Sequence, residues 1–362
     1  MVDFDALEAA GIANARERSG VIKYLDSLGF TAEEMVEAEG RGRLFGLGGD
    51  VLQSSGRAIY SMRTTAEALG VRVEDVEHAW ALLGLTVAGP DLIALSQPDV
   101  DGLAAWFQIK VLMGDDAAFG FLRVLGSSMA RLTEAESAII RAAAPDIQMN
   151  HTRDELATAQ AYRAISEFMP RIAGLIDVVH RHHVVSARTY FEDVMGDLTG
   201  ASVQCGIGFA DLSGFTSLTQ TLTPEELSML LNEFSSSVFD VVHGDGGRIV
   251  KFIGDEVMWV STTPELLAKA AIDLVDHPGA REAGLRVRAG LGYGEVLAMY
   301  GDYFGNVVNL AARLVAAAQP GQILATSAVR DGLPQWPAIP QDPLMLKGFD
   351  DPVTAYDLHV DR

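Results

Sequence analysis

Two aspartates, each beside residues that favour turns, are the best candidates for binding a cation. Asp211 follows the apolar run Val203–Phe209 and precedes a Gly/Ser turn, while Asp255 lies in Gly254-Asp255-Glu256. If the stretches around them pair as antiparallel strands, the two carboxylates meet at one edge of a sheet. Two carboxylates in one place repel each other unless cations neutralise them, so the pair favours a site for Mg²⁺ or Mn²⁺. Taken singly, Asp211 is more typical of a helix cap and Asp255 of an ordinary turn.

A polar pair on a predicted helix is the second candidate. The segment from about Gly305 to Ala318 is apolar nearly all round, yet Asn309 and Arg313 lie four residues apart on one of its faces. A guanidinium beside an amide donor can stabilise charge that builds on a phosphoryl group. A solvated polar pair on a helix surface is the alternative. Because polar side chains on such an apolar helix need a partner, the functional interpretation is favoured.

Strand and helix patterns alternate from residue 201 to the end, and they place these residues in one domain. The predicted elements are a strand over 203–209, a helix over 224–243, strands over 249–253 and 257–260, a helix from 264, a strand over 285–291 that turns at 293–295, a helix over 305–318, a strand over 323–325 and a C-terminal pair of strands. This order is that of a ferredoxin-like α+β domain. Lys251 lies four residues before Asp255, so a straight strand would point both side chains to the same face.

The segments around Asp211, Asp255 and Asn309, in this order, resemble the class III nucleotide cyclases over residues 201–362. The resemblance implies a ferredoxin-like catalytic domain in which Asp211 and Asp255 bind two metal ions per active site. The other implied contacts are the carbonyl of Leu212 to the metal, Phe215 and Thr216 to the substrate, Lys251 and Asp302 to the purine, Asn309 to the ribose, Arg313 to the α-phosphate and Lys347 to the terminal phosphates. For Lys347, an ordinary surface lysine is an equal alternative.

The purine pair also indicates the substrate. A cationic donor such as Lys251 can meet adenine N1 while the carboxylate of Asp302 accepts from the N6 amine, and guanine reverses this pattern, so ATP is favoured over GTP. In the family, the metal aspartates come from one chain, and the purine pair, asparagine and arginine from the other. All six are present here, so the resemblance implies a homodimer with two equivalent sites that converts ATP to cyclic AMP and pyrophosphate. A catalytically inactive cyclase-like dimerisation or nucleotide-sensing module, and a guanylyl or promiscuous cyclase, are the alternatives.

The first half of the chain has a different pattern. Apolar residues recur at spacings of three and four through residues 1–183, with Gly- or Pro-containing breaks such as Gly46–Asp50, which predicts an all-α domain. A further short amphipathic helix is predicted over residues 184–200 as a linker. This layout is similar to actinobacterial cyclases with an N-terminal autoinhibitory domain, some of which respond to pH. We therefore expect residues 1–183 to regulate the catalytic domain in a signal-transduction pathway.

Three histidines stand just before the predicted linker. His180, His182 and His183 flank an arginine, and histidine changes its charge between about pH 5 and 8. One hypothesis is that their protonation repositions the linker and so shifts the dimer between inactive and active states, and a solvated polar patch is the alternative. The apolar helices could also enclose a lipid or another small-molecule ligand.

Composition excludes other classes of function. A formal net charge of −22 over 362 residues opposes nucleic-acid binding, because the phosphates would be repelled. The only cysteine, Cys205, cannot form an internal disulfide, which fits a reducing compartment. We find no run of about 18 apolar residues and expect no transmembrane segment. The sequence therefore predicts a soluble cytoplasmic enzyme.

Overall fold

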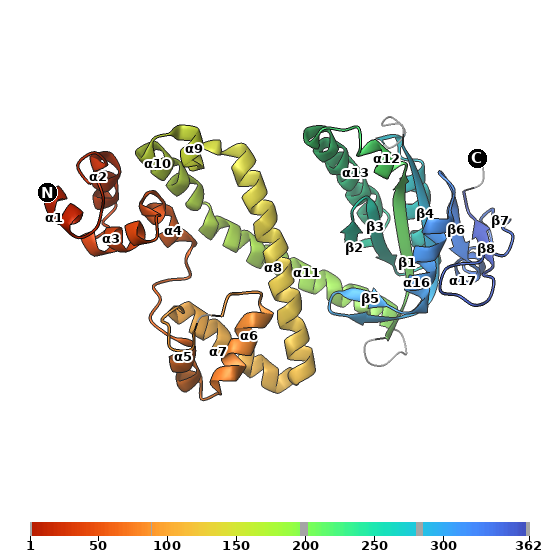
Figure 1. The fold of residues 1–362 in the computed structure, drawn as a ribbon. Coiled ribbons are helices and arrows are strands. Elements are labelled where there is room, and N and C mark those ends of the chain that lie inside the picture. The colour runs from red at the N-terminus through yellow and green to blue at the C-terminus, as the bar shows by residue number, and fades with distance from the viewer. Residues whose placement is uncertain (1, 88, 196–201, 280–284, 360–362) are drawn as a thin grey trace. The chain divides into compact units, whose positions relative to one another are not determined.

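The chain forms two compact units, Met1–His182 and His183–Arg362 (Figure 1). The computed structural model describes residues 2–87, 89–195, 202–279 and 285–359. The division falls inside one helix, α11 (Met169–Met195). The prediction of a separate short linker helix over 184–200 is therefore wrong, since residues 184–195 continue a helix that begins at Met169. No glycine or proline between 175 and 195 interrupts it. The predicted end at Gly200 lies outside the described residues.

The first unit has helices and no named strand among its described residues, which confirms the all-α prediction. Its elements before α11 are α1 (Phe4–Ala9), α2 (Ser19–Ser27), α3 (Ala32–Gly40), η1 (Leu44–Gly46), α4 (Leu47–Gln53), α5 (Met62–Leu69), α6 (Val73–Leu82), α7 (Gln97–Met113), α8 (Asp115–Ala143), η2 (Pro145–Ile147), α9 (Met149–Thr152) and α10 (Glu155–Ser166). One apolar core joins α1–α4 to α10, and a second joins α5–α8. No helix in the described part of the chain is long and apolar enough to cross a membrane.

The glycines in Gly46–Asp50 allow close helix packing and do not interrupt the helical structure. Residues 47–50 form the first turn of α4, where the sequence predicted an interruption. A Cβ atom added at Gly49 would lie 2.5 Å from the ring of Tyr162 on α10. The absence of a side chain at Gly49 therefore lets α4 and α10 approach closely.

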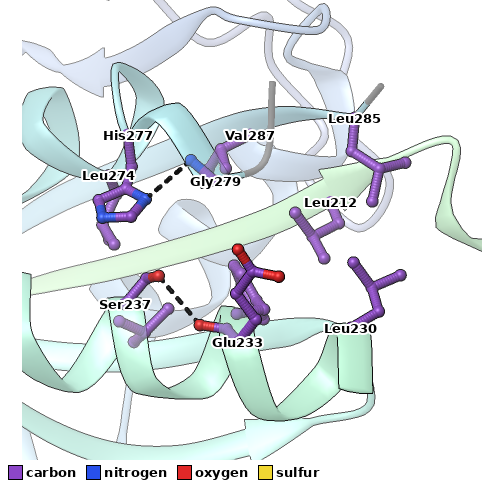
Figure 2. A pocket seen from close by; sticks show the side chains of 11 residues that line it. Leu212, Leu230, Glu233, Ser237, Leu274, His277, Gly279, Leu285 and Val287 are labelled. Atoms are coloured by element: carbon purple, nitrogen blue, oxygen red, sulfur yellow. Dashed lines mark hydrogen bonds between the residues drawn. The ribbon is translucent and has the colours of Figure 1, made fainter. Parts of the chain in front are cut away.

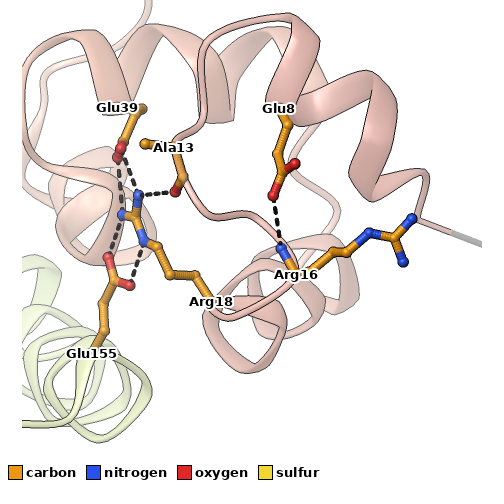
Figure 3. A network of polar contacts seen from close by, with 6 residues as sticks. All are labelled: Glu8, Ala13, Arg16, Arg18, Glu39 and Glu155. Atoms are coloured by element: carbon orange, nitrogen blue, oxygen red, sulfur yellow. Dashed lines mark hydrogen bonds and ion pairs between the residues drawn. The ribbon is translucent and has the colours of Figure 1, made fainter.

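A charged network joins three helices of the first unit (Figure 3). Arg18, at the start of α2, donates to Glu39 of α3 at 2.5 and 2.9 Å and to Glu155 of α10 at 2.6 and 2.8 Å. All three side chains are less than a quarter exposed, at 23%, 18% and 19%. Hydrogen bonds to the two carboxylates, Glu155 first, raise the pKa of Arg18 further above its ordinary value. The neighbouring Arg16 forms its ion pair with Asp5 at 2.6 Å in solvent.

The second unit is a sheet with helices on both faces. After the end of α11, its elements are β1 (Ser202–Ser213), α12 (Phe215–Leu218), α13 (Pro224–Gly244), β2 (Arg248–Ile253), β3 (Glu256–Ser261), α14 (Pro264–Val275), β4 (Arg286–Met299), β5 (Asp302–Phe304), α16 (Asn306–Ala317), β6 (Ile323–Thr326), α17 (Ser327–Asp331), β7 (Ile339–Pro340) and β8 (Ala355–Asp357). The strand order is β2-β3-β1-β4-β6-β8-β7, with β5 paired to β4. This α+β arrangement, including the hairpin β2–β3 and the C-terminal pair β7–β8, follows the predicted order.

Successive side chains of β1 point to opposite faces of the sheet and contribute to two hydrophobic cores. Cys205, Ile207 and Phe209 pack with α16 on one face of the sheet, while Ala210 and Leu212 pack with α13 and α14 on the other. Figure 1 shows α13 and α16 on opposite sides of the central strands. The first turn of α13 carries the predicted capping box, in which Thr223 and Glu226 exchange hydrogen bonds with each other's backbone N–H.

Strand β4 is longer than predicted. Residues 293–295 continue the strand, with Gly294 opposite Cys205 of β1, so the predicted turn there is wrong. The reversal comes instead at Tyr300 and Gly301, which both have positive φ angles, before β5. Further back along β4, a Cβ atom added at Gly290 would lie 2.2 Å from the backbone nitrogen of Val315. Gly290 therefore lets α16 lie directly against the sheet.

Candidate active site

Asp211 lies near the end of β1 and forms an ion pair with Arg288 of β4. The two residues are register partners, and Nη2 and Nε of Arg288 donate to Oδ2 of Asp211 at 2.6 and 2.9 Å. Nη1 of Arg288 also donates to the carbonyl oxygens of Ala316 and Ala318, at 3.3 and 3.2 Å. The guanidinium thus connects Asp211 to the C-terminal end of α16.

Two more carboxyl groups surround Asp211. Asp255, between β2 and β3, lies within hydrogen-bonding reach of Asp211, and Glu256 is the cross-strand partner of Asp211. Burial, and then the negative charges of Asp211 and Asp255, raise the pKa of Glu256 to about 7. Burial and Asp211 likewise raise the pKa of Asp255, against the opposing effects of a backbone hydrogen bond and Arg288. The structure brings Asp211 and Asp255 together, and Arg288 bonds Asp211 while its charge opposes the rise in the pKa values of the other two acids.

This acid cluster, defined as Asp211, Asp255 and Glu256, suits a hard divalent cation. Carboxylate oxygens are the ligands that Mg²⁺ and Mn²⁺ prefer, and a cation there would stabilise the charged forms of the two acids whose pKa values are raised by burial and then by repulsion. Among the described residues, no group of three or more His, Cys, Asp or Glu is arranged to hold a metal ion alone. Further ligands would therefore come from a backbone carbonyl or from the substrate. Leu212, whose carbonyl is the predicted ligand, is buried in β1.

Lys251 and Asp302 form an ion pair in the same unit. Lys251 belongs to β2 and Asp302 begins β5, two strands that are not neighbours in the sheet. A register shift between Ile249 and Lys251 interrupts β2 before Lys251, and from Lys251 to Ile253 the strand pairs regularly with β3. The two residues predicted to read the purine are therefore together, at 35% and 27% side-chain exposure.

Asn309 and Arg313 lie one turn apart on α16 and are exposed. The opposite face of the helix, including Ala311, Leu314 and Val315, is buried against the sheet. Within the described part of the chain, Arg313 has no ion pair with an acid. The single chain therefore presents these two donors on its surface, away from the core.

The remaining predicted contacts are spread around the domain. Phe215 starts α12 and packs against the core that holds α13 and α14, and Thr216 follows it in the same short helix. Lys347 is exposed in a turn near the C-terminus rather than on a strand. The structure groups neither Phe215 nor Lys347 with the acid cluster through a hydrogen bond or ion pair.

A small cavity lies behind Leu212 (Figure 2). Its lining is mainly apolar, from Leu230 of α13 to Leu274 of α14, with Glu233 among the few polar residues. Its volume of about 20 Å³ has room for a water molecule and not for a nucleotide. The substrate therefore does not bind in this cavity.

Comparison with known proteins identifies the domain that carries these residues. Residues 200–360 match the family model described as the adenylate and guanylate cyclase catalytic domain. An uncharacterized protein of Mycobacterium tuberculosis is 69% identical over 358 residues, which cover 99% of this chain and 94% of the relative. This chain belongs to the adenylate and guanylate cyclase family.

Two further similarities cover different parts of this cyclase. A pH-sensitive adenylate cyclase of Mycobacterium tuberculosis is 27% identical over 334 residues, which cover 90% of this chain and 82% of the relative. The crystal structure of the adenylyl cyclase CyaB from P. aeruginosa is similar at 25% identity and a TM-score of 0.41. It covers 44% of this chain and 96% of that chain.

Two charged residues of the cyclase domain went unnoticed in the sequence. Arg288 and Glu256 are not among the site residues that the sequence predicts. Both could have been found from the register of the strands, because the pairing of β1 with β3 and β4 places Glu256 and Arg288 opposite Asp211. The pairing of the strands, rather than any short sequence motif, thus brings the acid cluster and Arg288 together.

The three histidines of the cyclase lie on α11. His180, His182 and His183 are all exposed, and near them Arg181 forms an ion pair with Asp177 at 3.0 Å, one turn earlier. They lie on both sides of the division between the two units, which falls after His182. Their regulatory role stays a prediction.

Proposed function

We propose that this chain is an adenylyl cyclase, which converts ATP to cyclic AMP and pyrophosphate in a homodimer. The observation that carries the proposal is the contact between Asp211 and Asp255, in a unit that also pairs Lys251 with Asp302. The name of the pH-sensitive adenylate cyclase among the relatives supports ATP as the substrate.

The acid cluster is where the triphosphate would be neutralised. Asp211 and Asp255, with the carbonyl of Leu212, would hold two ions of Mg²⁺ or Mn²⁺. When bound, such ions offset the charge of the phosphates and lower the pKa of the ribose 3′-hydroxyl. Arg288 already neutralises Asp211 in the free protein, and its guanidinium can also donate to phosphate oxygens.

Lys251 and Asp302 would read the adenine edge. The ammonium of Lys251 donates to N1 and the carboxylate of Asp302 accepts from the N6 amine, while guanine offers the reverse pattern. Their ion pair in the structure holds both groups at one place before the base arrives. Such preorganisation limits the side-chain entropy that would be lost on binding.

Asn309 and Arg313 would act on the reacting atoms. Asn309 orients the ribose so that its 3′-oxygen can attack the α-phosphorus in line, and Arg313 donates to the α-phosphate as negative charge builds there. The new bond joins the 3′-oxygen to phosphorus, the hydroxyl proton passes to water, the bond to the bridging oxygen breaks, and pyrophosphate leaves with the electron pair. Lys347 would contact the terminal phosphates.

A second copy of the chain completes the site. The acid cluster needs cations and anionic substrate, whereas α16 exposes Asn309 and Arg313 without an acid partner in the described part of the chain. In a two-fold dimer, the acids of one protomer face the donors of the other, and two equivalent sites result.

Residues 1–183 would regulate this reaction, with α11 as the connection to the catalytic domain. The pH-sensitive relative supports a role for pH, and His180, His182 and His183 are the groups that we propose to sense it. The helices of this region could bind a lipid or another small molecule. ATP as substrate and a single cysteine favour the cytoplasm as the site of the reaction.

Incubation of the purified protein with ATP or GTP and Mn²⁺, with products identified by mass, tests the proposal. We expect cyclic AMP from ATP and much less cyclic GMP from GTP. Mainly cyclic GMP would indicate a guanylyl cyclase. No cyclic nucleotide from either substrate would favour an inactive dimerisation or nucleotide-sensing module.

A further inference from the structure

Two tyrosines enclose one guanidinium beside the Lys251–Asp302 pair. Tyr190 lies near the end of α11, Arg248 begins β2, and Tyr303 is the central residue of β5. The guanidinium carbon of Arg248 lies 4.8 Å from the ring centroid of Tyr190 and 5.9 Å from that of Tyr303. Arg248 also donates from Nη2 to the hydroxyl oxygen of Tyr303. We call these three residues the tyrosine–arginine cluster.

The cluster is largely removed from solvent. Tyr303 is 3% exposed, and Tyr190 packs against the same group of buried residues, which includes Cys205. Burial is the main reason that the pKa values of both tyrosines are raised, so both hydroxyls stay protonated. Because a cation over an aromatic face is attracted more strongly when both are desolvated, these contacts fix the end of α11 on the domain.

The tyrosine–arginine cluster continues directly into the purine pair. Arg248 and Lys251 of β2 contact consecutive residues of β5, Tyr303 and Asp302 respectively. The backbone N–H of Tyr303 also donates to Oδ1 of Asp302 at 2.8 Å. Since β5 is held in the sheet by only three residue pairs with β4, its contacts with β2 determine where Asp302 points.

We propose that Tyr190, Arg248 and Tyr303 are positioning residues that set the purine selectivity of Asp302. The inference rests on the proposed function and adds to it a route by which α11 acts on the site. Displacement of Tyr190 loosens Arg248, which releases Tyr303 and turns Asp302 away from the base. The route reaches the residues that read the base and leaves the acid cluster, on β1 and the β2–β3 hairpin, in place.

Substitutions in the full-length chain test this route. Tyr190→Leu keeps an apolar side chain but removes the aromatic face, Tyr190→Phe keeps the face, and Arg248→Met removes the cation. Thr189→Ala, at the neighbouring exposed position on α11, is the matched control. We would measure kcat and KM with ATP and with GTP, and in parallel the competition of ATP and GTP against a fluorescent ATP analogue at equilibrium.

We expect Tyr190→Leu and Arg248→Met to raise KM for ATP and to lower the ATP-to-GTP preference roughly tenfold, with a smaller change in kcat. Tyr190→Phe and Thr189→Ala should retain the preference. Equal losses with both nucleotides, or a Tyr190→Phe variant as impaired as Tyr190→Leu, would overturn the inference. If the chain turns over neither nucleotide, the proposed function fails, and the binding competition still decides whether the cluster sets selectivity.

Discussion

Asp211 is bonded to Arg288 and lies within hydrogen-bonding reach of Asp255, whereas Asn309 and Arg313 of the same unit are exposed on α16. The first region has an excess of negative charge that only cations can relieve. The second offers hydrogen-bond donors to an anion that the chain does not supply from its described residues. The acids need cations, and the donors on α16 need an anion. A triphosphate with bound cations would meet both needs. This difference is the reason for proposing that two chains together form the site.

Mixing two inactive variants is the most direct test of a site shared between two chains. We expect Asp211→Ala and Arg313→Ala each to lower kcat by about 10³-fold, because both remove groups that act on the reacting phosphate. In a random mixture, half of the dimers contain one of each chain, and one of their two sites is intact. Activity should therefore return to about a quarter of the wild-type value.

The measurement is cyclic AMP formation by each variant and by the mixture after subunit exchange. Dimerisation of each variant, followed by light scattering, is the control. An inactive mixture of variants that still dimerise contradicts a site shared between chains.

Reversal of the base-reading pair should have the next largest effect. Lys251→Glu with Asp302→Asn offers an acceptor to guanine N1–H and a donor to O6. We expect the ratio of cyclic AMP to cyclic GMP formed from equal ATP and GTP to fall by about 10²-fold. Lys23→Gln in the first unit makes the same net charge change of −1 elsewhere and should leave the ratio unaltered. An unchanged ratio in the double variant would exclude a role of this pair in base recognition.

Removal of Arg288 tests whether the acid cluster binds a cation. Arg288→Met leaves the acid cluster without its guanidinium, so we expect the free energy of unfolding to fall by about 2 kcal/mol in the absence of divalent cations. Added Mn²⁺ should then raise the melting temperature more than it does for the wild type. Arg286→Met, at the exposed position two residues earlier, should change neither quantity. Equal responses to Mn²⁺ in all three proteins would contradict a cation at these acids.

The network around Arg18 is a second place where acidic side chains meet one arginine. Arg18 donates two hydrogen bonds to each of its acids, Glu39 and Glu155. We therefore expect a structural role and no affinity for cations. Arg18→Met should lower the stability of the first unit by about 3 kcal/mol, because two half-buried carboxylates lose their partner. Arg16→Met, whose ion pair is in solvent, should have no measurable effect. Thermal unfolding with and without Mn²⁺ tests both expectations, and rescue of Arg18→Met by Mn²⁺ would be contrary to them.

The sequence predicted the catalytic elements well because each has a local cause. Thr223 and Glu226 cap α13, and the strands of the hairpin flank Gly254 at positive φ. The acids meet because that hairpin pairs with β1. Such features depend on residues close in the chain and on a single pairing of strands.

What the sequence did not reveal depends on distant packing. The glycine at 49 was interpreted as a break, yet it makes room for Tyr162, more than a hundred positions away. Likewise, Gly294 suggested a turn, but its pairing with Cys205 keeps β4 extended. Arg288 does not stand out in the sequence because its acid partner, Asp211, lies on another strand. Composition and periodicity contain no record of which strand lies beside which.

The close approach at Gly290 has a consequence for the exposed side of α16. With hydrogen as its only side chain, this residue sets the separation between helix and sheet, since a methyl group there would overlap the helix backbone at 2.2 Å. Any larger residue would lift α16 bodily outward and carry the Arg313 guanidinium with it. In the proposed dimer, one position in the middle of a strand would thus set how far Arg313 projects towards the second protomer.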